Sequence, residues 1–349
     1  MGSRLNRVKR YFELGRVFSA MLTAGAAILG AYAVGIEVEW WQILIFMAVG
    51  FFSHAFGCAL NEICDYELDK KVPEISHKPL IKGDITMVQA FSFTLVCLFA
   101  SYTLVIWFFP HMPTLIFFTL ANIFAAAYSF KAKYTPWAYD FTLGAGLFFY
   151  TLYGAAAVGE FDLLRDVLNF PMVMVAALII FLFEVFIQWG NAVKDVETDR
   201  LLKVPTRAVV WGYKHEDNLG IRDPNLVYGV IIKLFLITMF IIPFFLDSIG
   251  VVDFGFSNYL IGLPLYFVFF IILGIPAQLY SIYTMLGRHT RSSYINFIVK
   301  DGVLTWLACP FLVVDTIGVL GAIGLFFLPF IWFLFIKTIL YKTPMRPGL

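Results

Sequence analysis

Asn61-Glu-Ile-Cys-Asp65-Tyr-Glu-Leu-Asp69 is a pattern that this chain of 349 residues contains twice, the second time as Asn191-Ala-Val-Lys-Asp195-Val-Glu-Thr-Asp199. Both copies read N-x-x-x-D-x-x-x-D. On an α-helix, residues four apart stay on one face and drift by only about 40° per step. Each copy is therefore predicted to align one amide and two carboxylates on one stripe, at the end of an apolar helix.

Two such stripes that face each other would gather four carboxylates. These groups repel one another unless cations lie between them, and oxygen ligands in this number suit Mg²⁺, usually shared with substrate phosphates. The sequence therefore predicts a Mg²⁺ site. Its candidate ligands are Asn61, Asp65, Asp69, Asn191, Asp195 and Asp199.

The composition identifies the class of protein that carries these motifs. Hydrophobic residues make up 60% of the chain and charged residues 14%, against roughly 25% charged in soluble proteins. The chain is predicted to be an all-α polytopic membrane protein. Its four cysteines lie in or beside apolar runs without metal-type spacing, so we expect small packing residues and no disulfides. No nucleic-acid module is visible, so no nucleic-acid partner is expected.

Apolar stretches long enough to cross a bilayer recur along the whole chain. The tract from Val303 to Tyr341 is too long for one ordinary span, and it could turn at Pro310 or in the glycine-rich patch 318–324. A bundle of nine or ten transmembrane helices is therefore expected. Its spans are predicted near 15–36, 41–63, 86–109, 113–130, 137–158, 169–191, 227–248 and 259–285, followed by 303–341 as the last one or two helices.

Charge orders these helices across the membrane. Basic residues gather in the N-terminus and in alternate connections, including 70–82, 131–133, 194–214 and 288–300, whereas the other connections are acidic or neutral. Because basic connections face the cytoplasm, both motifs are predicted at the cytoplasmic ends of the second and sixth spans. The active site is thus expected to open at that side, where two long loops, about 64–85 and 195–226, could act as lids.

Basic side chains near the motifs are candidate anion ligands. A diphosphate needs lysine or arginine beside Mg²⁺, because the metal alone leaves phosphate oxygens unpaired. Lys78 follows the first motif, Lys194 and Arg200 flank carboxylates of the second, and Arg16 opens the first span. Tyr128-Ser-Phe-Lys131-Ala-Lys133 closes the fourth span and adds two more lysines.

Together these features resemble the UbiA superfamily of intramembrane prenyltransferases. The two aspartate-rich motifs lie in the family's order and spacing. His77-Lys-Pro-Leu-Ile-Lys-Gly83-Asp-Ile85 is similar to the family's R-P-L-x-x-G-x-I loop, with Lys78 in place of the usual arginine, and Tyr128-Ser with Lys131 is similar to its Y-S/T…K turn. The likeness covers most of residues 10–300. We expect residues 1–349 to form a single transmembrane prenyltransferase domain with 10–300 as its core.

The resemblance implies Mg²⁺-dependent transfer of a prenyl group from a prenyl diphosphate to a lipophilic acceptor among the membrane lipids. It implies that Asp65, Asp69, Asp195 and Asp199 are catalytic through the metal. The expected ligands of the diphosphate are Lys78, Lys131, Lys133, Tyr128 and Arg200, and Arg16 is expected to bind the acceptor.

Several acceptors remain open at this stage. The first span, from Tyr11 to Tyr32, resembles the lipid-ether and pigment branches more than the quinone branch, which favours geranylgeranyl transfer to a geranylgeranylglyceryl phosphate-type lipid. An aromatic quinone precursor or a chlorophyll precursor is the alternative, and a lipid-phosphate phosphoribosyl transferase is a third. A transporter would place its carboxylates near the membrane midplane. A CDP-alcohol phosphotransferase would need a D-G-x-x-A-R run that Asp301-Gly302 does not begin.

Overall fold

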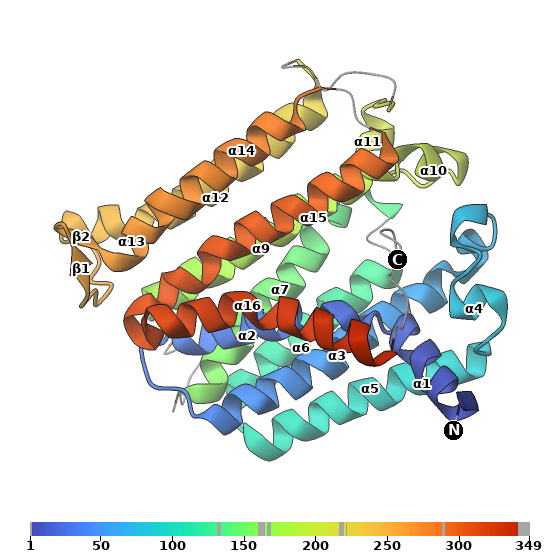
Figure 1. The fold of residues 1–349 in the computed structure, drawn as a ribbon, viewed down its shortest axis with the longest axis horizontal. Helices are drawn as coiled ribbons and strands as arrows, with labels where there is room; N and C mark the ends of the chain where they lie inside the picture. Colours follow the sequence, from blue (N-terminus) through green and yellow to red (C-terminus); the bar gives the residue numbers. More distant parts are fainter. Residues whose placement is uncertain are drawn as a thin grey trace.

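The structure is a computed structural model that describes residues 2–130, 134–159, 165, 169–215, 220, 222–287 and 290–340. Within these ranges the chain is a bundle of long helices, and one short hairpin pairs β1 (Tyr259–Leu260) with β2 (Leu263–Pro264) (Figure 1). The long helices of the first half are α1 (Gly2–Leu14), α2 (Ala20–Tyr32), α3 (Trp40–Asp69), α5 (Met87–Phe108), α6 (Met112–Phe130) and α7 (Pro136–Val158). Those of the second half are α9 (Pro171–Lys194), α12 (Pro224–Ser248), α14 (Ile275–Met285), α15 (Arg291–Ala308) and α16 (Val314–Leu340).

Shorter helices connect or extend these. They are α4 (Pro79–Lys82), α10 (Val196–Leu201), α11 (Arg207–Val210) and α13 (Leu265–Phe269), with a π-helix at Phe270–Gly274 and 3-10 turns at Val17–Ser19, Pro73–Ile75 and Cys309–Val313.

Local signals begin several of the long helices. Proline occupies the first turn of α7, α9 and α12, where its missing N–H has no helical partner to lose. Thr86 caps α5 by accepting a hydrogen bond from the backbone N–H of Gln89, and the Gln89 side chain completes a capping box. Apolar length and polar caps thus coincide, so the predicted helices lie close to the observed ones.

The predicted polytopic membrane class is confirmed by the apolar helices. Eight helices of the described chain are long and apolar enough to cross a membrane, or nine with the pair 8–14 and 17–32, which is bent by 67°. Arg16 lies at this bend with φ 45° and ψ 39°, a left-handed conformation that is uncommon outside glycine. The last candidate, Arg291–Thr338, contains the non-helical Gly318 and therefore comprises two helices, in agreement with nine or ten spans.

The structure corrects the prediction for the last third of the chain. Residues 291–300, expected in a basic cytoplasmic connection, form the first turns of α15, and Thr290 caps this helix by accepting from the backbone N–H of Ser293. The charged residues had suggested a loop, but Tyr294 and Phe297 between them are buried, so this segment packs against the bundle as a helix.

The apolar tract that follows contains the expected turn. At Pro310 the chain only tightens into a 3-10 segment, whereas at Gly318, in the predicted glycine-rich patch, the backbone is non-helical (φ 67°, ψ 170°). The chain folds back there, since the indole N–H of Trp306 donates to the carbonyl of Phe326.

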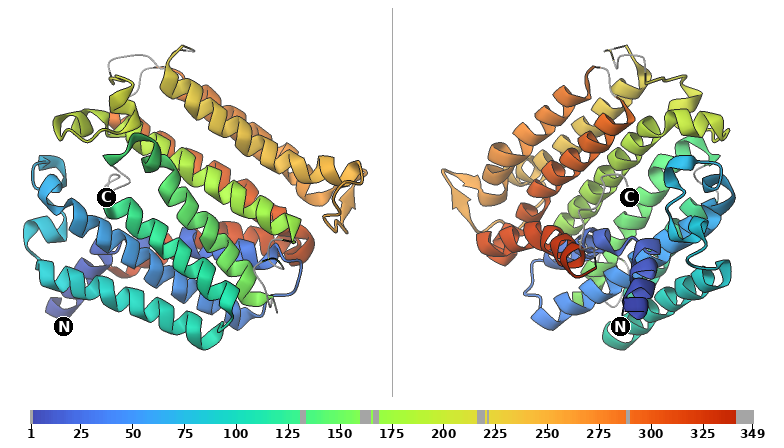
Figure 2. Two further views of the ribbon diagram at one scale, coloured as in Figure 1. Left: turned by 180° about the vertical axis from the view of Figure 1, so that it is seen from behind. Right: turned by 45° about the vertical axis from the view of Figure 1, so that its right-hand side comes forward.

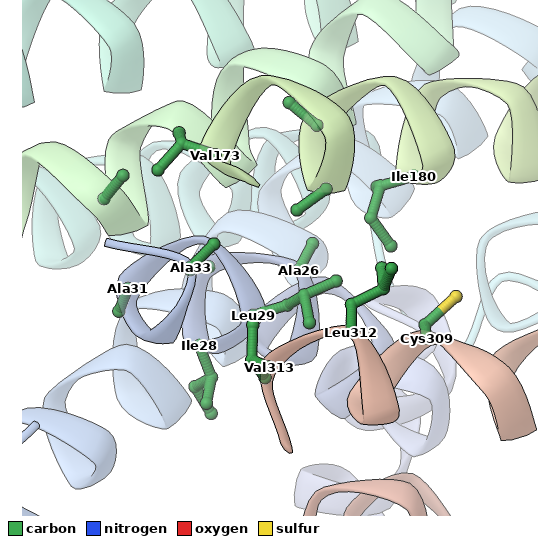
Figure 3. Close-up of a cluster of buried hydrophobic side chains, with 14 of the residues drawn as sticks. Ala26, Ile28, Leu29, Ala31, Ala33, Val173, Ile180, Cys309, Leu312 and Val313 are labelled. Atoms are coloured by element: carbon green, nitrogen blue, oxygen red, sulfur yellow. The ribbon is translucent and has the colours of Figure 1, made fainter. Parts of the chain in front are cut away.

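The packing core surrounds α2, whose middle is almost fully buried. In the close-up of Figure 3, side chains of α2 such as Ala26 and Leu29 lie against Val173 and Ile180 of α9 and against Leu312 of the 3-10 turn. Small residues let α2 and α7 approach closely. A Cβ atom on Gly30 would lie 1.9 Å from the backbone oxygen of Thr151, and one on Gly154 would lie 1.9 Å from that of Ala27.

Both motif regions lie at the same end of the bundle. Figures 1 and 2 show α4, α10 and α11 at this end together with α1, and the β1–β2 hairpin at the opposite end. The 30 residues of α3 span about 45 Å, which exceeds the roughly 30 Å of a bilayer's hydrocarbon core. The last turns of α3 can therefore carry polar groups beyond the apolar layer.

Candidate active site

The first motif occupies the last turns of α3. Lys78, just before α4, reaches back to this helix, and its Nζ lies 2.7 Å from Oδ2 of Asp69. The chain turns back after α4 at Gly83, whose φ of 81° is a conformation that glycine adopts without a steric penalty. The predicted neighbourhood of Lys78 and the first motif is therefore present in the structure.

Glu62 is a central residue of this half of the site that the sequence interpretation missed. Its side chain is only 6% exposed and forms two ion pairs, with Nη2 of Arg16 at 2.5 Å and with Nζ of Lys78 at 3.0 Å. Glu62 therefore fixes the expected acceptor ligand and the expected diphosphate ligand relative to each other. Glu62 and Asp69 are seven residues, or two helical turns, apart, and this spacing could have predicted that both lie on the same face of the helix.

The second motif does not lie on one uninterrupted helix, which corrects the prediction. Asn191 is on α9 and Asp199 on α10, and Asp195 between them has φ −98° and ψ 8°. Aspartate favours helix ends because its short side chain competes for backbone hydrogen bonds. The break is local, since the backbone N–H groups of Asp195 and Asp199 still donate to the carbonyls four residues earlier.

Both carboxylates of the second motif have partners from within the chain. Asp195 is 3.1 Å from Nζ of Lys194 and 3.1 Å from Nη2 of Arg291, and Asp199 accepts a hydrogen bond of 3.1 Å from the Thr206 hydroxyl. Burial, together with the neighbouring charge of Asp195, raises the pKa of Asp199 to about 7. Arg291 and Thr206 were not predicted, because Arg291 was assigned to a distant loop and nothing local marked Thr206.

The remaining predicted ligands are distributed unevenly. Tyr128 donates to Oε1 of Gln188 (3.2 Å), one turn before Asn191, so it links α6 to the second motif. Arg200 instead contacts Glu197 (2.6 Å) and the Tyr213 carbonyl (2.5 Å), so the structure does not bring it to the motif's aspartates. Lys131 and Lys133 lie outside the described residues.

Basic side chains neutralise carboxylates of both motifs in this structure. Among the described residues, no three histidine, cysteine or acidic side chains lie close enough to hold a metal ion in this arrangement. Lys78, Lys194 and Arg291 supply the counter-charges instead. The donor set, carboxylates and amides at one end of the bundle, is the oxygen chemistry that Mg²⁺ prefers. By the chemistry of its donors, this set of residues fits Mg²⁺.

Comparison with known proteins places the chain in a family. A model of the UbiA prenyltransferase family matches residues 20–273. The chain belongs to this family of membrane prenyltransferases, which confirms the resemblance and excludes the transporter alternative.

Two relatives illustrate the range of the family. The chain is 27% identical over 206 residues to protoheme IX farnesyltransferase 1 of Paramagnetospirillum magneticum, a match that covers 59% of this chain and 70% of the relative. It is 28% identical over 215 residues to digeranylgeranylglyceryl phosphate synthase of Thermococcus kodakarensis, covering 61% and 72%.

Solved structures share the fold. A digeranylgeranylglyceryl phosphate synthase structure matches with a TM-score of 0.63 at 19% identity, covering 91% of this chain and 99% of that one. A UbiA homologue from Archaeoglobus fulgidus, bound to GPP and Mg²⁺, matches with a TM-score of 0.60 at 14% identity, covering 88% and 99%. At this identity the likeness establishes the fold alone.

Proposed function

We propose that this prenyltransferase moves a geranylgeranyl group from its diphosphate to a geranylgeranylglyceryl phosphate-type lipid, with Mg²⁺ at the two motifs. The observation that carries the proposal is the meeting of both acidic motifs with basic side chains at one end of the bundle. The opposite charges suit a metal and a diphosphate in the same place. The Archaeoglobus fulgidus homologue bound to GPP and Mg²⁺ supports this choice of ligands.

The metal would be held by Asn61, Asp65, Asp69, Asn191, Asp195 and Asp199. When bound, it would supply positive charge that stabilises the departing diphosphate. Lys78 and Arg291 now neutralise Asp69 and Asp195. With a metal on those carboxylates, both cations would be available to bind oxygens of the diphosphate.

The basic residues assist departure of the leaving group. The bond between C1 of the prenyl chain and the diphosphate oxygen breaks, and the electron pair leaves with the diphosphate. Lys78 and Tyr128, with Lys131 and Lys133, are proposed to bind this anion, and Arg200 would join them only by leaving its contacts with Glu197 and the Tyr213 carbonyl. Stabilising such developing charge is usually the largest catalytic contribution. C1 then bonds to the acceptor, which releases a proton.

Arg16 is proposed to bind the acceptor's phosphate. Its guanidinium is anchored by Glu62 at the point where the chain bends into the bundle, and a left-handed residue held in place there is typical of a functional position. The similarity to digeranylgeranylglyceryl phosphate synthases of two Thermococcus species supports a lipid acceptor. The similarity to protoheme IX farnesyltransferases makes a porphyrin the second candidate. An aromatic quinone or chlorophyll precursor, or a phosphoribosyl transfer, rests on the sequence resemblance alone.

The chain is further proposed to form one domain over residues 1–349, with both motifs facing the cytoplasm. The positive charge of the connections at that end supports this orientation.

The decisive experiment is incubation of purified protein with radiolabelled geranylgeranyl diphosphate, Mg²⁺ and one acceptor at a time. The panel is geranylgeranylglyceryl phosphate, haem, 4-hydroxybenzoate and a chlorophyllide. We expect labelled product with the glycerol-phosphate lipid, and none when EDTA removes the metal. Product with haem or an aromatic acceptor alone would overturn the lipid assignment. Absence of both product and Mg²⁺-dependent diphosphate binding would overturn the proposed site.

A further inference from the structure

Arg16 holds a backbone conformation that few residues other than glycine adopt. Its φ of 45° and ψ of 39° lie in the left-handed region, where a Cβ atom crowds the following carbonyl oxygen. A residue in this conformation persists only where the surrounding structure holds it there. The chain bends by 67° at this position, so the groups that hold Arg16 also fix how its side chain leaves the bend.

Arg16 is held at both its backbone and its side chain. Its carbonyl accepts two hydrogen bonds of 3.1 Å from Ser19, one from the backbone N–H and one from the hydroxyl. Its guanidinium forms the ion pair of 2.5 Å with Glu62 of α3. Trp332 of α16 supports the bend from another helix, because its indole N–H donates to the carbonyl of Val17 at 2.7 Å.

His54 of α3 completes the backbone contact. Its Nε2 lies 3.0 Å from the Ser19 hydroxyl oxygen, and its Nδ1 lies 3.0 Å from that of Thr23. Ser19 and Thr23 are four residues apart, so their hydroxyls lie on the same side of the helical segment that follows Arg16. The Cys58 thiol is 3.5 Å from the same Nε2, a longer contact. Both ring nitrogens of His54 are therefore engaged by this segment.

The hydrogen bonds indicate which nitrogen of His54 carries the proton. The Ser19 hydroxyl donates its one proton to the Arg16 carbonyl, so its oxygen accepts a hydrogen bond from Nε2–H. Nδ1 of the neutral ring is then an acceptor for the Thr23 hydroxyl. A second ring proton would add a cation beside Arg16, whose charge acts on His54. The neutral Nε2–H form of histidine therefore suits this position.

α3 thus holds Arg16 at two points. His54 acts on its carbonyl through Ser19, and Glu62, eight residues further along the helix, contacts its guanidinium directly. Glu62 also pairs with Lys78 at 3.0 Å. The helix that carries the first motif therefore places the proposed ligand of the acceptor relative to the proposed ligand of the diphosphate.

We propose that His54 is a positioning residue, which through Ser19 keeps Arg16 in the left-handed conformation from which its guanidinium binds the anionic group of the acceptor. This inference rests on the proposed function, in which Arg16 binds the acceptor. His54 acts only through the bend, so its loss should weaken binding of the acceptor and leave binding of the prenyl diphosphate unchanged.

Two variants separate the ring nitrogens of His54. The amide nitrogen of glutamine lies as many bonds from Cα as Nε2 does, and that of asparagine as many as Nδ1, so only glutamine can still donate to Ser19. We expect His54→Asn to raise the KM for the acceptor about fivefold, the usual effect of one hydrogen bond, at unchanged KM for the donor. His54→Gln should stay within about twofold of the unchanged enzyme.

Ser19→Ala removes the other half of the same contact. It should raise the KM for the acceptor as His54→Asn does, and the double variant His54→Asn/Ser19→Ala should be no worse than either, because both changes break one interaction. Ser248→Ala is the matched control. Ser248 also donates to a carbonyl three residues earlier, that of Phe245, but it is exposed at the end of α12. All variants should melt near the temperature of the unchanged protein.

Unchanged KM for the acceptor in both His54→Asn and Ser19→Ala would overturn the proposal, and so would an equal rise in KM for donor and acceptor. Failure of the unchanged protein to use the glycerol-phosphate lipid would overturn the proposed function alone. The KM would then be measured with the acceptor of the panel that reacts, since each of them carries an anionic group.

NMR of protein with ¹⁵N-labelled histidine tests the contact without any acceptor. The signal that is lost in His54→Gln should show the neutral Nε2–H form and should change in Ser19→Ala. An Nδ1–H form, or a signal that Ser19→Ala leaves unchanged, would overturn the proposal.

Discussion

At the scale of single residues, carboxylates of both acidic motifs form ion pairs with basic side chains. Asp69 contacts Lys78, and Asp195 contacts both Lys194 and Arg291. Such pairs keep like-charged carboxylates compatible before a metal binds. Lys78 and Arg291 are also the cations that we propose for binding the diphosphate.

Replacing one aspartate in each motif tests the metal site. Asp65→Ala and Asp195→Ala should each lower Mg²⁺-dependent prenyl transfer about 100-fold or more, because the developing charge on the leaving group loses its stabilisation. Glu67→Ala is the matched control, since this carboxylate lies on the same helix as Asp65 but is 79% exposed and forms a surface ion pair with Lys70. Turnover would be measured together with the melting temperature. Full activity in both aspartate variants would remove the motifs from the mechanism.

Lys78 should be replaceable by arginine but not by a neutral residue. Lys78→Ala removes the cation near Asp69 and should raise the KM for the prenyl diphosphate about tenfold, the usual cost of one charge-assisted contact. Lys78→Arg retains the charge and adds a guanidinium that can bind phosphate through two hydrogen bonds. Steady-state kinetics with both variants check this. Equal KM values for the alanine variant and the unchanged enzyme would assign Lys78 a purely structural contact.

The pKa of Asp199 gives the site a pH dependence. Because burial and then Asp195 raise it to about 7, Asp199 is protonated below that pH and cannot serve as an anionic ligand. Apparent Mg²⁺ affinity should therefore increase as pH rises from 6 to 8, with release of a proton on binding. The Thr206 hydrogen bond lowers this pKa, so Thr206→Val should move the midpoint to higher pH. Metal titrations at several pH values measure both effects, and pH-independent affinity would contradict them.

At the scale of elements, the crossing of α2 and α7 depends on two glycines. Neither Gly30 nor Gly154 has room for a Cβ, because the neighbouring backbone oxygen would be 1.9 Å away. α2 follows the bend at Arg16, and α7 carries Asp140, the partner of Arg207. Their spacing therefore affects the site without contact to any ligand.

Gly154→Ala should destabilise the protein by roughly 1–3 kcal/mol, because overpacking forces the backbones apart. Gly57→Ala on α3 is the control, since nothing lies within 4 Å of its added Cβ and alanine has the higher helix propensity. Thermal unfolding in detergent compares the two variants. A melting temperature for Gly154→Ala at or above that of Gly57→Ala would show that the helices tolerate a wider separation.

A second element depends on a buried ion pair. Arg207 on α11 is completely buried and contacts Asp140 of α7, while its guanidinium lies 4.2 Å from the ring centroid of Tyr228. Burial lowers the pKa of Arg207, and the carboxylate of Asp140 opposes this shift. The pair anchors the segment that follows the second motif, including Thr206, against the bundle.

At the scale of the whole molecule, the two motif regions share one end and the β1–β2 hairpin occupies the other (Figures 1 and 2). Basic connections predict that the motif end faces the cytoplasm. Single cysteines at Lys71 and Leu201 should react with an impermeant maleimide only when the cytoplasmic face is accessible. A cysteine at Ile261, which is 92% exposed, should react only from the other side.

The unchanged chain is the control for this labelling, because it has four cysteines of its own. Labelling would be compared in right-side-out and inverted vesicles. Reaction of the Lys71 and Leu201 variants from opposite sides would contradict the shared end of the two motifs. The reversed pattern for all three positions would contradict only the orientation.

Local patterns in the sequence determined the class of protein, most helix positions and the two motifs. Hydrophobic length and repeated spacing reflect interactions between residues close in the chain, so they can be interpreted without a fold. The same reasoning failed where other interactions outweighed the local sequence pattern. Asp195 breaks its helix, and residues 291–300 begin α15, in which Tyr294 and Phe297 are buried and Arg291 pairs with Asp195.

Only the tertiary structure decided which charges meet. Glu62 pairs with Arg16, 46 residues away, and Asp195 pairs with Arg291, 96 residues away. Such pairs depend on which faces of distant helices pack together, and this depends on side-chain shape throughout the core. The sequence therefore determined which groups are available for prenyl transfer, and the packing of the helices decided how they are paired.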